Sequence, residues 1–270
     1  MRQRLSALSY DALASLIVGA AMAPAPWPLW RHPQGRNVTF RASDGMTLRG
    51  WLFEPSQPTA TLVLGHGYRE HRRQLTFLAS HFMMRGLRVL AFDFRAHGES
   101  AGRQITFGLN EAQDVNGALT RARAFGDPVV YLGFSMGAAA YLLSGNEADA
   151  AVLDSPYDTL TRTVTLRLRK ARWPMILDPL VFERGAIRLG ADVNTVRPVD
   201  AVLGLKRPSL FVFASEDGWI PEENREAFRQ ALSTSGQIVT LDQGGHADHF
   251  TAPWLHQITS FVMDAVRVRP

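Results

Sequence analysis

One serine in this sequence lies in a pattern that equips it for nucleophilic chemistry. Ser135 is the centre of Gly133-Phe134-Ser135-Met136-Gly137, which follows a run of apolar, β-favouring residues and precedes a small-residue segment that favours a helix. A strand, a sharp turn and a helix hold such a serine in strained backbone geometry, and the two glycines let strand and helix approach closely. The pattern therefore predicts a serine that attacks acyl carbon atoms.

A serine hydroxyl is a poor nucleophile until an imidazole takes its proton, and the imidazole needs a carboxylate on its far nitrogen. We expect Asp217 to be the carboxylate and His246 the base, because each directly follows a predicted strand. Sites gather at the carboxyl ends of parallel strands. The order serine, aspartate, histidine is that of α/β-hydrolases, whereas chymotrypsin-like and subtilisin-like enzymes use other orders.

Three residues compete for these two roles. Glu216 and Asp154 are alternative carboxylates, and His249 is an alternative base. We prefer Asp217 because it lies just before a tight turn, and His246 because it directly follows a pair of glycines.

The oxyanion of an acyl intermediate needs two backbone N–H donors that are already in place. Met136, directly after the nucleophile, is expected to supply one. The other is assigned to Tyr68, in the loop of residues 65–68 that follows a predicted strand. His66 and His97 are expected to shape loops rather than to catalyse.

Strands alternate with helices after an initial hairpin at Asp44-Gly45, and this alternation predicts a mostly parallel sheet covered by helices on both faces. The predicted strands are residues 37–43, 46–53, 60–67, 87–94, 129–134, 150–154, 208–214 and 237–241. The predicted helices are residues 71–85, 109–124, 221–232 and 254–266. The fold class is thus α/β, with about eight strands.

Residues 155–206 contain no predicted buried strand and are interpreted as a helical cap inserted over Ser135. The alternative is a set of helices that only closes one end of the sheet. If the segment is a cap, an apolar wall for the substrate is expected from Trp173, Ile176, Leu180 and Phe182.

These motifs jointly resemble those of α/β-hydrolase fold serine hydrolases of the esterase, lipase and peptidase type, from about residue 38 to the C-terminus. The matching segments are His66-Gly67, residues 93–100, residues 133–137, Asp217 and Gly245-His246. The resemblance implies a carboxylesterase that cleaves a small or medium ester, thioester or amide through an acyl-enzyme. Acyltransferase, thioesterase and aminopeptidase activities, or a non-catalytic binding protein of this fold, remain alternatives.

The loop of residues 93–100 departs from the family pattern at one position. The family usually has Arg-Gly-His-Gly, and this chain has Ala96 in place of the first glycine. Alanine costs little there unless the backbone needs a positive φ. Asp93 and Arg95 are expected to pair with each other and fix this loop.

The chain divides into residues 1–36, an apolar helix with a proline-rich link, and residues 37–270, the hydrolase domain. Residues 13–23 carry no charge but are shorter than the roughly 20 residues that span a bilayer. The alternatives are a helix packed on the domain or on a partner, a membrane-associated segment and, less favoured, a cleaved signal. The corresponding locations are the cytoplasm or a membrane surface, with secretion less favoured.

Composition excludes several classes of function. The chain of 270 residues has a net charge of +4, but its basic residues are dispersed and form no stripe, so nucleic-acid binding is not expected. It has no cysteine and therefore no thiol nucleophile or thiolate metal site. We expect no metal and no cofactor, and a small ester-like molecule as the partner; the sequence leaves the oligomeric state open.

Overall fold

The computed structural model describes residues 2–26, 34–232, 236–246 and 251–267. Its strands are β1 (Ala25–Pro26), β2 (Arg36–Arg41), β3 (Thr47–Phe53), β4 (Ala60–Gly65), β5 (Leu87–Asp93), β6 (His97–Gly98), β7 (Val129–Phe134), β8 (Ala150–Asp154), β9 (Ser209–Ala214) and β10 (Gly236–Leu241). Its α-helices are α1 (Arg2–Ala21), α2 (Thr76–Met83), α3 (Glu111–Arg123), α4 (Met136–Leu143), α5 (Leu160–Lys170), α6 (Asp178–Leu189), α7 (Glu222–Ala231) and α8 (Ala252–Arg267). Short 3₁₀ turns are η1 (Arg72–Leu75), η2 (Met175–Leu177), η3 (Val193–Thr195) and η4 (Pro198–Gly204).

Eight strands form one sheet in the order β10-β9-β8-β7-β4-β5-β3-β2. The strands from β10 to β5 run parallel, whereas β3 pairs antiparallel with both β5 and β2. The predicted eight-stranded, mostly parallel sheet is therefore confirmed, and so is the initial hairpin. The small β1–β6 pair, which was not predicted, forms a separate two-stranded sheet.

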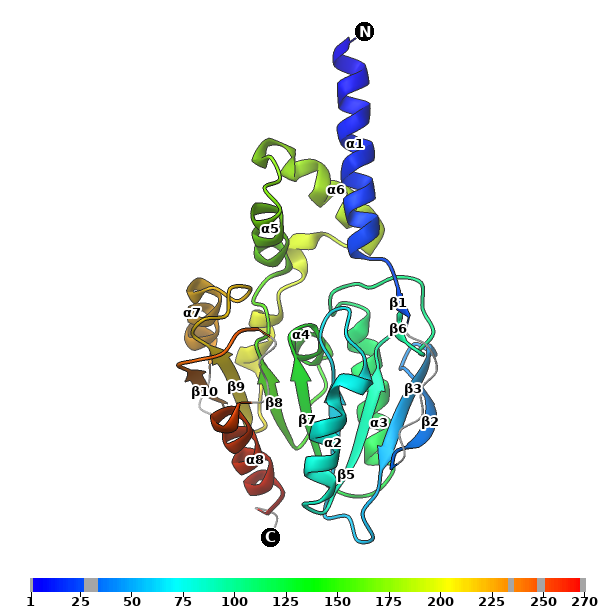
Figure 1. Ribbon diagram of the computed structural model, residues 1–270, viewed down its shortest axis with the longest axis vertical. Helices are drawn as coiled ribbons and strands as arrows, with labels where there is room; N and C mark the ends of the chain where they lie inside the picture. The colour runs from blue at the N-terminus through cyan, green and yellow to red at the C-terminus, as the bar shows by residue number, and fades with distance from the viewer. Residues whose placement is uncertain (1, 27–33, 233–235, 247–250, 268–270) are drawn as a thin grey trace.

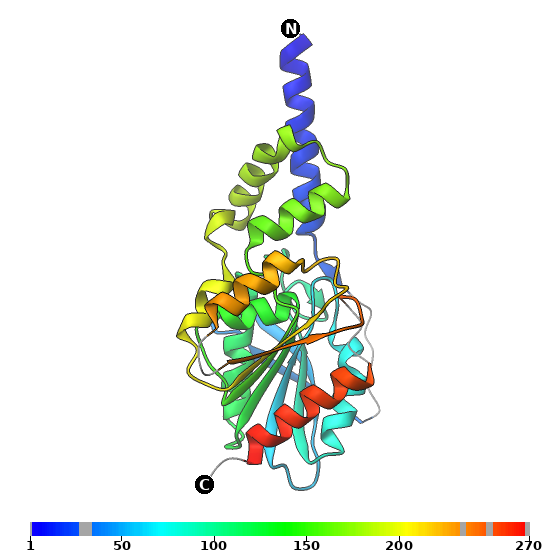
Figure 2. The same cartoon turned by 90° about the vertical axis from the view of Figure 1, so that its left-hand side faces the viewer.

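Helices cover both faces of the sheet, as expected (Figure 1; Figure 2). Alternate residues of β7 face opposite sides: Tyr131 packs in the core with α3 and α4, and Leu132 packs in the core with α2 and α8. Every residue of β4, β7, β8 and β9 is buried. This two-sided burial explains why these strands are continuous apolar runs without alternation.

The segment between β8 and β9 contains α5 and α6, which stand at one end of the molecule together with α1 (Figure 1; Figure 2). Helix α1 packs along α6, and Arg184 of α6 forms an ion pair of 2.6 Å with Asp11 of α1. The chain after α1 is fixed to the domain because Ile105 N donates to Met22 O at 2.9 Å. Within the described ranges, no helix has both the length and the apolar character needed to cross a bilayer.

Candidate active site

Ser135 lies at the sharp turn between β7 and α4, with φ 48° and ψ −111°. A Cβ on Gly133 would come within 2.9 Å of Ala138 N, and a Cβ on Gly137 within 2.6 Å of His66 O. Both contacts are shorter than real Cβ atoms show, so only glycine fits at either position. The two glycines thus allow β7, α4 and the loop after β4 to meet around a serine held in a strained conformation.

The structure brings Ser135, Asp217 and His246 together from three separate strand ends. The ring of His246 lies between the other two side chains, with Nε2 2.9 Å from Ser135 Oγ and Nδ1 2.7 Å from Asp217 Oδ2. When Nδ1–H donates to the carboxylate, Nε2 is the unprotonated nitrogen and can accept the serine hydroxyl proton. The arrangement is therefore chemically able to generate a serine nucleophile.

Asp217 is held in place by more than the histidine. Its Oδ1 accepts hydrogen bonds from Trp219 N at 2.8 Å and from Ile220 N at 3.1 Å. Burial opposes ionisation of this carboxyl group, but the hydrogen bond from His246 and these two amides outweigh it and hold the pKa of Asp217 below its ordinary value of 3.8. The group therefore stays an anion at neutral pH.

Neither of the two alternative carboxylates takes the place of Asp217 beside His246. Glu216 is exposed to solvent. Asp154 is buried at the end of β8, where its Oδ2 accepts the indole N–H of Trp254 at 2.5 Å. The alternative base, His249, lies outside the described residues, so its position is not compared with that of His246.

The loop after β4 lies against the serine turn, as the contact of Gly137 with His66 O shows. Tyr68 and Met136 line one small chamber with Ser135 and His246. The amide of Met136 is the first of α4 and has no acceptor within the helix. Tyr68 also makes contacts that were not predicted: its hydroxyl group donates to Ala21 O of α1 at 2.6 Å, and its ring stacks on Phe107.

His66 and His97 shape loops in the structure. His66 Nε2 accepts from Phe94 N at 3.0 Å and its Nδ1 lies 2.8 Å from Gly67 O, which requires the Nδ1–H tautomer. His97 has the same arrangement, with Nε2 accepting from Arg69 N at 3.2 Å. Burial lowers the pKa of both rings, so both are neutral.

The expected Asp93–Arg95 pair does not form. Asp93 instead pairs with Arg72, and Arg95 is shared between Asp44 and Asp114. In a continuous strand, residues two apart point to the same side, but β5 ends at Asp93 and Arg95 lies beyond it, where the chain turns, so each side chain meets a different element.

Alanine was expected to cost little at position 96 unless the backbone needs a positive φ, and the φ of Ala96 is in fact 58°. The position does need the left-handed conformation that the family's glycine would adopt more readily. Gly102 packs closely against Ala96: a Cβ on Gly102 would come within 2.5 Å of Ala96 N.

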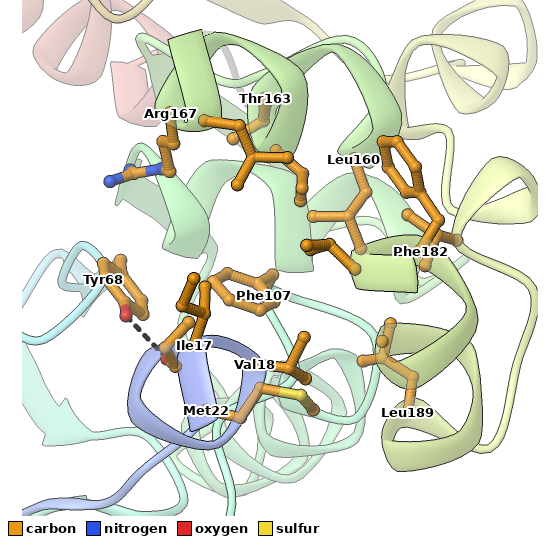
Figure 3. A pocket seen from close by; sticks show the side chains of 16 residues that line it. Ile17, Val18, Met22, Tyr68, Phe107, Leu160, Thr163, Arg167, Phe182 and Leu189 are labelled. Carbon is orange, nitrogen blue, oxygen red and sulfur yellow. Dashed lines mark hydrogen bonds between the residues drawn. The ribbon is translucent and has the colours of Figure 1, made fainter. Parts of the chain in front are cut away.

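A second, apolar pocket of about 110 Å³ is shown in Figure 3. It adjoins the chamber at Ser135, since four residues border both spaces. Of the four cap residues expected to form an apolar wall, only Phe182 lines the apolar pocket. Ile176 is 86% exposed at the surface, whereas Trp173 and Leu180 pack against the core outside the pocket lining. The connection from α5 to α6 turns Ile176 outward, so Phe182 alone of the four borders this pocket.

Sequence reasoning missed several residues around Ser135. Phe107, Tyr157, Thr163, Arg167 and Trp219 all border the chamber. Phe107 has a φ of 57°, which no sequence pattern signals. Trp219 could have been found, because it follows the expected acid by two residues.

Arg167 is unusual among these residues. Its guanidinium lies 4.7 Å from the centroid of the Trp219 ring and 5.3 Å from that of Tyr68, and its Nε is buried without a hydrogen-bond partner in the part of the chain that is described. Burial lowers the pKa of Arg167 from its ordinary value. The cation is therefore stabilised mainly by aromatic faces.

No group of three or more histidine, cysteine, aspartate or glutamate side chains with the geometry of a metal site occurs among the described residues.

The fold and the strand-turn-helix serine define the class of α/β-hydrolases. A family model described as the alpha/beta hydrolase family matches residues 62–256, and the chain belongs to this family. An uncharacterized protein of Mycobacterium tuberculosis is 35% identical over 244 residues, covering 86% of this chain and 80% of that protein.

Two further comparisons concern proteins with named activities. A monoacylglycerol lipase of Mycolicibacterium smegmatis is 33% identical over 109 residues, covering 37% of this chain and 39% of the lipase. The solved structure of a Pyrococcus furiosus esterase superposes with a TM-score of 0.73 at 21% identity, covering 91% of this chain and 97% of the esterase. At that identity the superposition supports the fold.

Proposed function

We propose that this protein is a serine hydrolase that cleaves small or medium carboxylic esters through an acyl-enzyme. The observation that carries the proposal is the ring of His246, with one nitrogen 2.9 Å from Ser135 Oγ and the other 2.7 Å from Asp217. The named activities of the lipase and esterase relatives agree with it.

The reaction follows from this geometry. Ser135 Oγ bonds to the ester carbonyl carbon while its proton passes to His246 Nε2. The oxyanion is held by the amides of Met136 and Tyr68. The carbon–oxygen bond to the alcohol then breaks, and the alcohol leaves with the proton from His246. Water, deprotonated by the same nitrogen, attacks the carbonyl carbon of the acyl-enzyme. The bond from this carbon to Ser135 Oγ then breaks, Oγ takes the proton back from His246, and the carboxylic acid leaves.

The test is reaction with a fluorophosphonate probe and turnover of p-nitrophenyl acetate. We expect the wild type to label and turn over, and Ser135→Ala to lose both, with kcat lower by about a millionfold. Ser155→Ala is the matched control, because Ser155 follows the next strand and has a similar φ of 49°. Equal labelling of wild type and Ser135→Ala, or no turnover by the wild type, would refute the proposal.

We also propose that the protein associates peripherally with lipid surfaces through the helical end of the molecule. Large apolar side chains are exposed there on α1, the α5–α6 connection and α6: Leu13, Leu16, Met175, Ile176 and Ile187. The exposed cations Lys170, Arg172 and Arg188 lie on the same elements or beside them. Apolar side chains among cations favour the interface of an anionic membrane.

A further inference from the structure

The apolar pocket next to Ser135 has walls from three helices, of which α1 lies far in the sequence from α5 and α6. Helix α1 contributes Ile17, Val18 and Ala21, and Met22 directly follows it, whereas α5 and α6 contribute most of the rest. Figure 3 shows Ile17, Val18 and Met22 facing Leu160 and Phe182 across the pocket. The lining is almost wholly carbon, so the pocket suits an aliphatic or aryl group and offers little to a polar one.

The apolar pocket and the chamber at the serine adjoin each other. Tyr68, Phe107, Thr163 and Arg167 border both spaces. His246, which must face the leaving alcohol in order to protonate it, borders only the chamber. The acyl half of an ester bound at Ser135 is therefore the half that can enter the apolar pocket.

Helix α1 is held against the loop that carries one of the expected oxyanion donors. Tyr68 Oη donates to Ala21 O at 2.6 Å, and Arg69 Nη1 donates to Ala20 O at 3.2 Å. These two bonds fix the last turn of α1 relative to the amide of Tyr68. An acyl tail that contacts Ile17 and Ala21 is therefore held at a fixed position relative to the Tyr68 amide, which would bind the carbonyl oxygen of the same substrate.

The size of the pocket limits the group that it accepts. A protein cavity of about 150 Å³ holds benzene, which has six carbons. By proportion, the 110 Å³ found here accommodates about four carbons of an acyl tail, beyond the carbonyl carbon at Ser135. Phe182 and Gly185 line the pocket from α6; a larger side chain at Gly185 has room to enter it, because a Cβ there meets only Val193 Cγ2 at 3.5 Å.

We propose that α1 is a substrate-binding element, forming with α5 and α6 an acyl subsite that selects esters of about four to six acyl carbons. This inference rests on the proposed ester hydrolysis at Ser135. In this proposal, residues 17–22 contribute to the choice of substrate. The uncharged, apolar run of residues 13–23 does not by itself indicate such a role.

The experiment measures kcat/KM for p-nitrophenyl acetate, butyrate, hexanoate and decanoate. The wild type is expected to prefer butyrate or hexanoate over acetate by about tenfold or more, and to lose this advantage at decanoate. Ile17→Phe fills the pocket from α1, and its hexanoate-to-acetate ratio is expected to fall by about tenfold. Gly185→Val fills it from α6, with the same effect and without altering α1. Phe182→Ala enlarges it and shifts the optimum to a longer chain.

Leu16→Phe is the matched control, because Leu16 neighbours Ile17 but is exposed, and its acyl-chain profile should equal that of the wild type. If acetate is turned over but Ile17→Phe and Gly185→Val keep the wild-type profile, the pocket is only a packing gap and the inference fails. If acetate turnover is absent or independent of Ser135, the proposed function itself fails. Should Ile17→Phe not fold, as judged by circular dichroism, Gly185→Val decides the question.

Discussion

At the scale of single residues, the two oxygens of Asp217 have different partners, and this difference makes a sharp test. In Asp217→Asn the amide oxygen can keep the hydrogen bonds from Trp219 and Ile220, which places the NH₂ group against His246 Nδ1. The ring must then carry its proton on Nε2, where it cannot accept one from Ser135. We expect kcat to fall by about ten-thousandfold with the circular dichroism spectrum unchanged. Glu216→Gln, on the exposed neighbour, should leave kcat unchanged, and an active Asp217→Asn would contradict the role of the acid.

The lowered pKa of Asp217 predicts how stability depends on pH. Because the pKa is lower in the folded chain than its ordinary 3.8, the ionised group stabilises the fold above that value, and the contribution is lost as the pH falls through the folded pKa. The free energy of unfolding of Asp217→Asn should therefore be lower than that of the wild type at pH 6, and the difference should shrink near pH 3. Urea unfolding at both pH values measures it. A difference that grows in acid would mean that the pKa is raised instead.

Ala96 offers a stability test that is independent of catalysis. A left-handed conformation costs an alanine about 1–2 kcal/mol, and glycine adopts it freely, although glycine loses more entropy on folding. Since φ is 58° here, Ala96→Gly should raise the free energy of unfolding by about 0.5–1 kcal/mol. Ala101→Gly, in the same loop but without a positive φ, should lower it. Urea unfolding of both variants decides the sign.

At the scale of elements, one of the two hydrogen bonds that join α1 to the loop after β4 comes from a single hydroxyl group. Tyr68→Phe keeps the ring that stacks on Phe107 and removes only the hydrogen bond to Ala21 O. A loss of about 1 kcal/mol in the free energy of unfolding is expected. Tyr10→Phe on the exposed part of α1 is the control and should change nothing measurable. Equal stabilities of Tyr68→Phe and the wild type would show that the hydroxyl group does not tie α1 to the domain.

The elements that the sequence predicted are those whose signals are local. Buried strands such as β4 and β7 are continuous apolar runs, and the serine turn needs glycines at fixed positions, so both could be predicted from short segments. The partners of Asp93 and Arg95 could not, because Arg72 and Asp114 reach them from other elements. The place of α1 was equally out of reach: its apolar residues are spread around the helix, so no pattern in the sequence marks the face that is buried or the surface that covers it.

At the scale of the whole molecule, the chemistry and the exposed apolar surface lie toward the same end. Helices α1, α5 and α6 rise together beyond the sheet (Figure 1), with Ile17 and Val18 facing the pocket and Leu13 and Leu16 exposed. One helix thus borders both the proposed acyl subsite and the proposed lipid-facing surface. An ester that partitions into a membrane would meet the pocket from the side on which the protein rests.

This arrangement predicts binding to vesicles that contain anionic lipid, measured by co-sedimentation. Ile176 is 86% exposed at the connection between α5 and α6, so Ile176→Asp should reduce the bound fraction by several-fold, since a charge in that position opposes burial in the interface. Met84→Asp is the matched control: Met84 is 74% exposed but follows α2 on the body of the domain, and its substitution should leave binding unchanged. Because the exposed cations contribute, binding should also weaken with added salt and with neutral vesicles. Equal binding by both variants would place the membrane contact elsewhere, and no binding by the wild type would refute it.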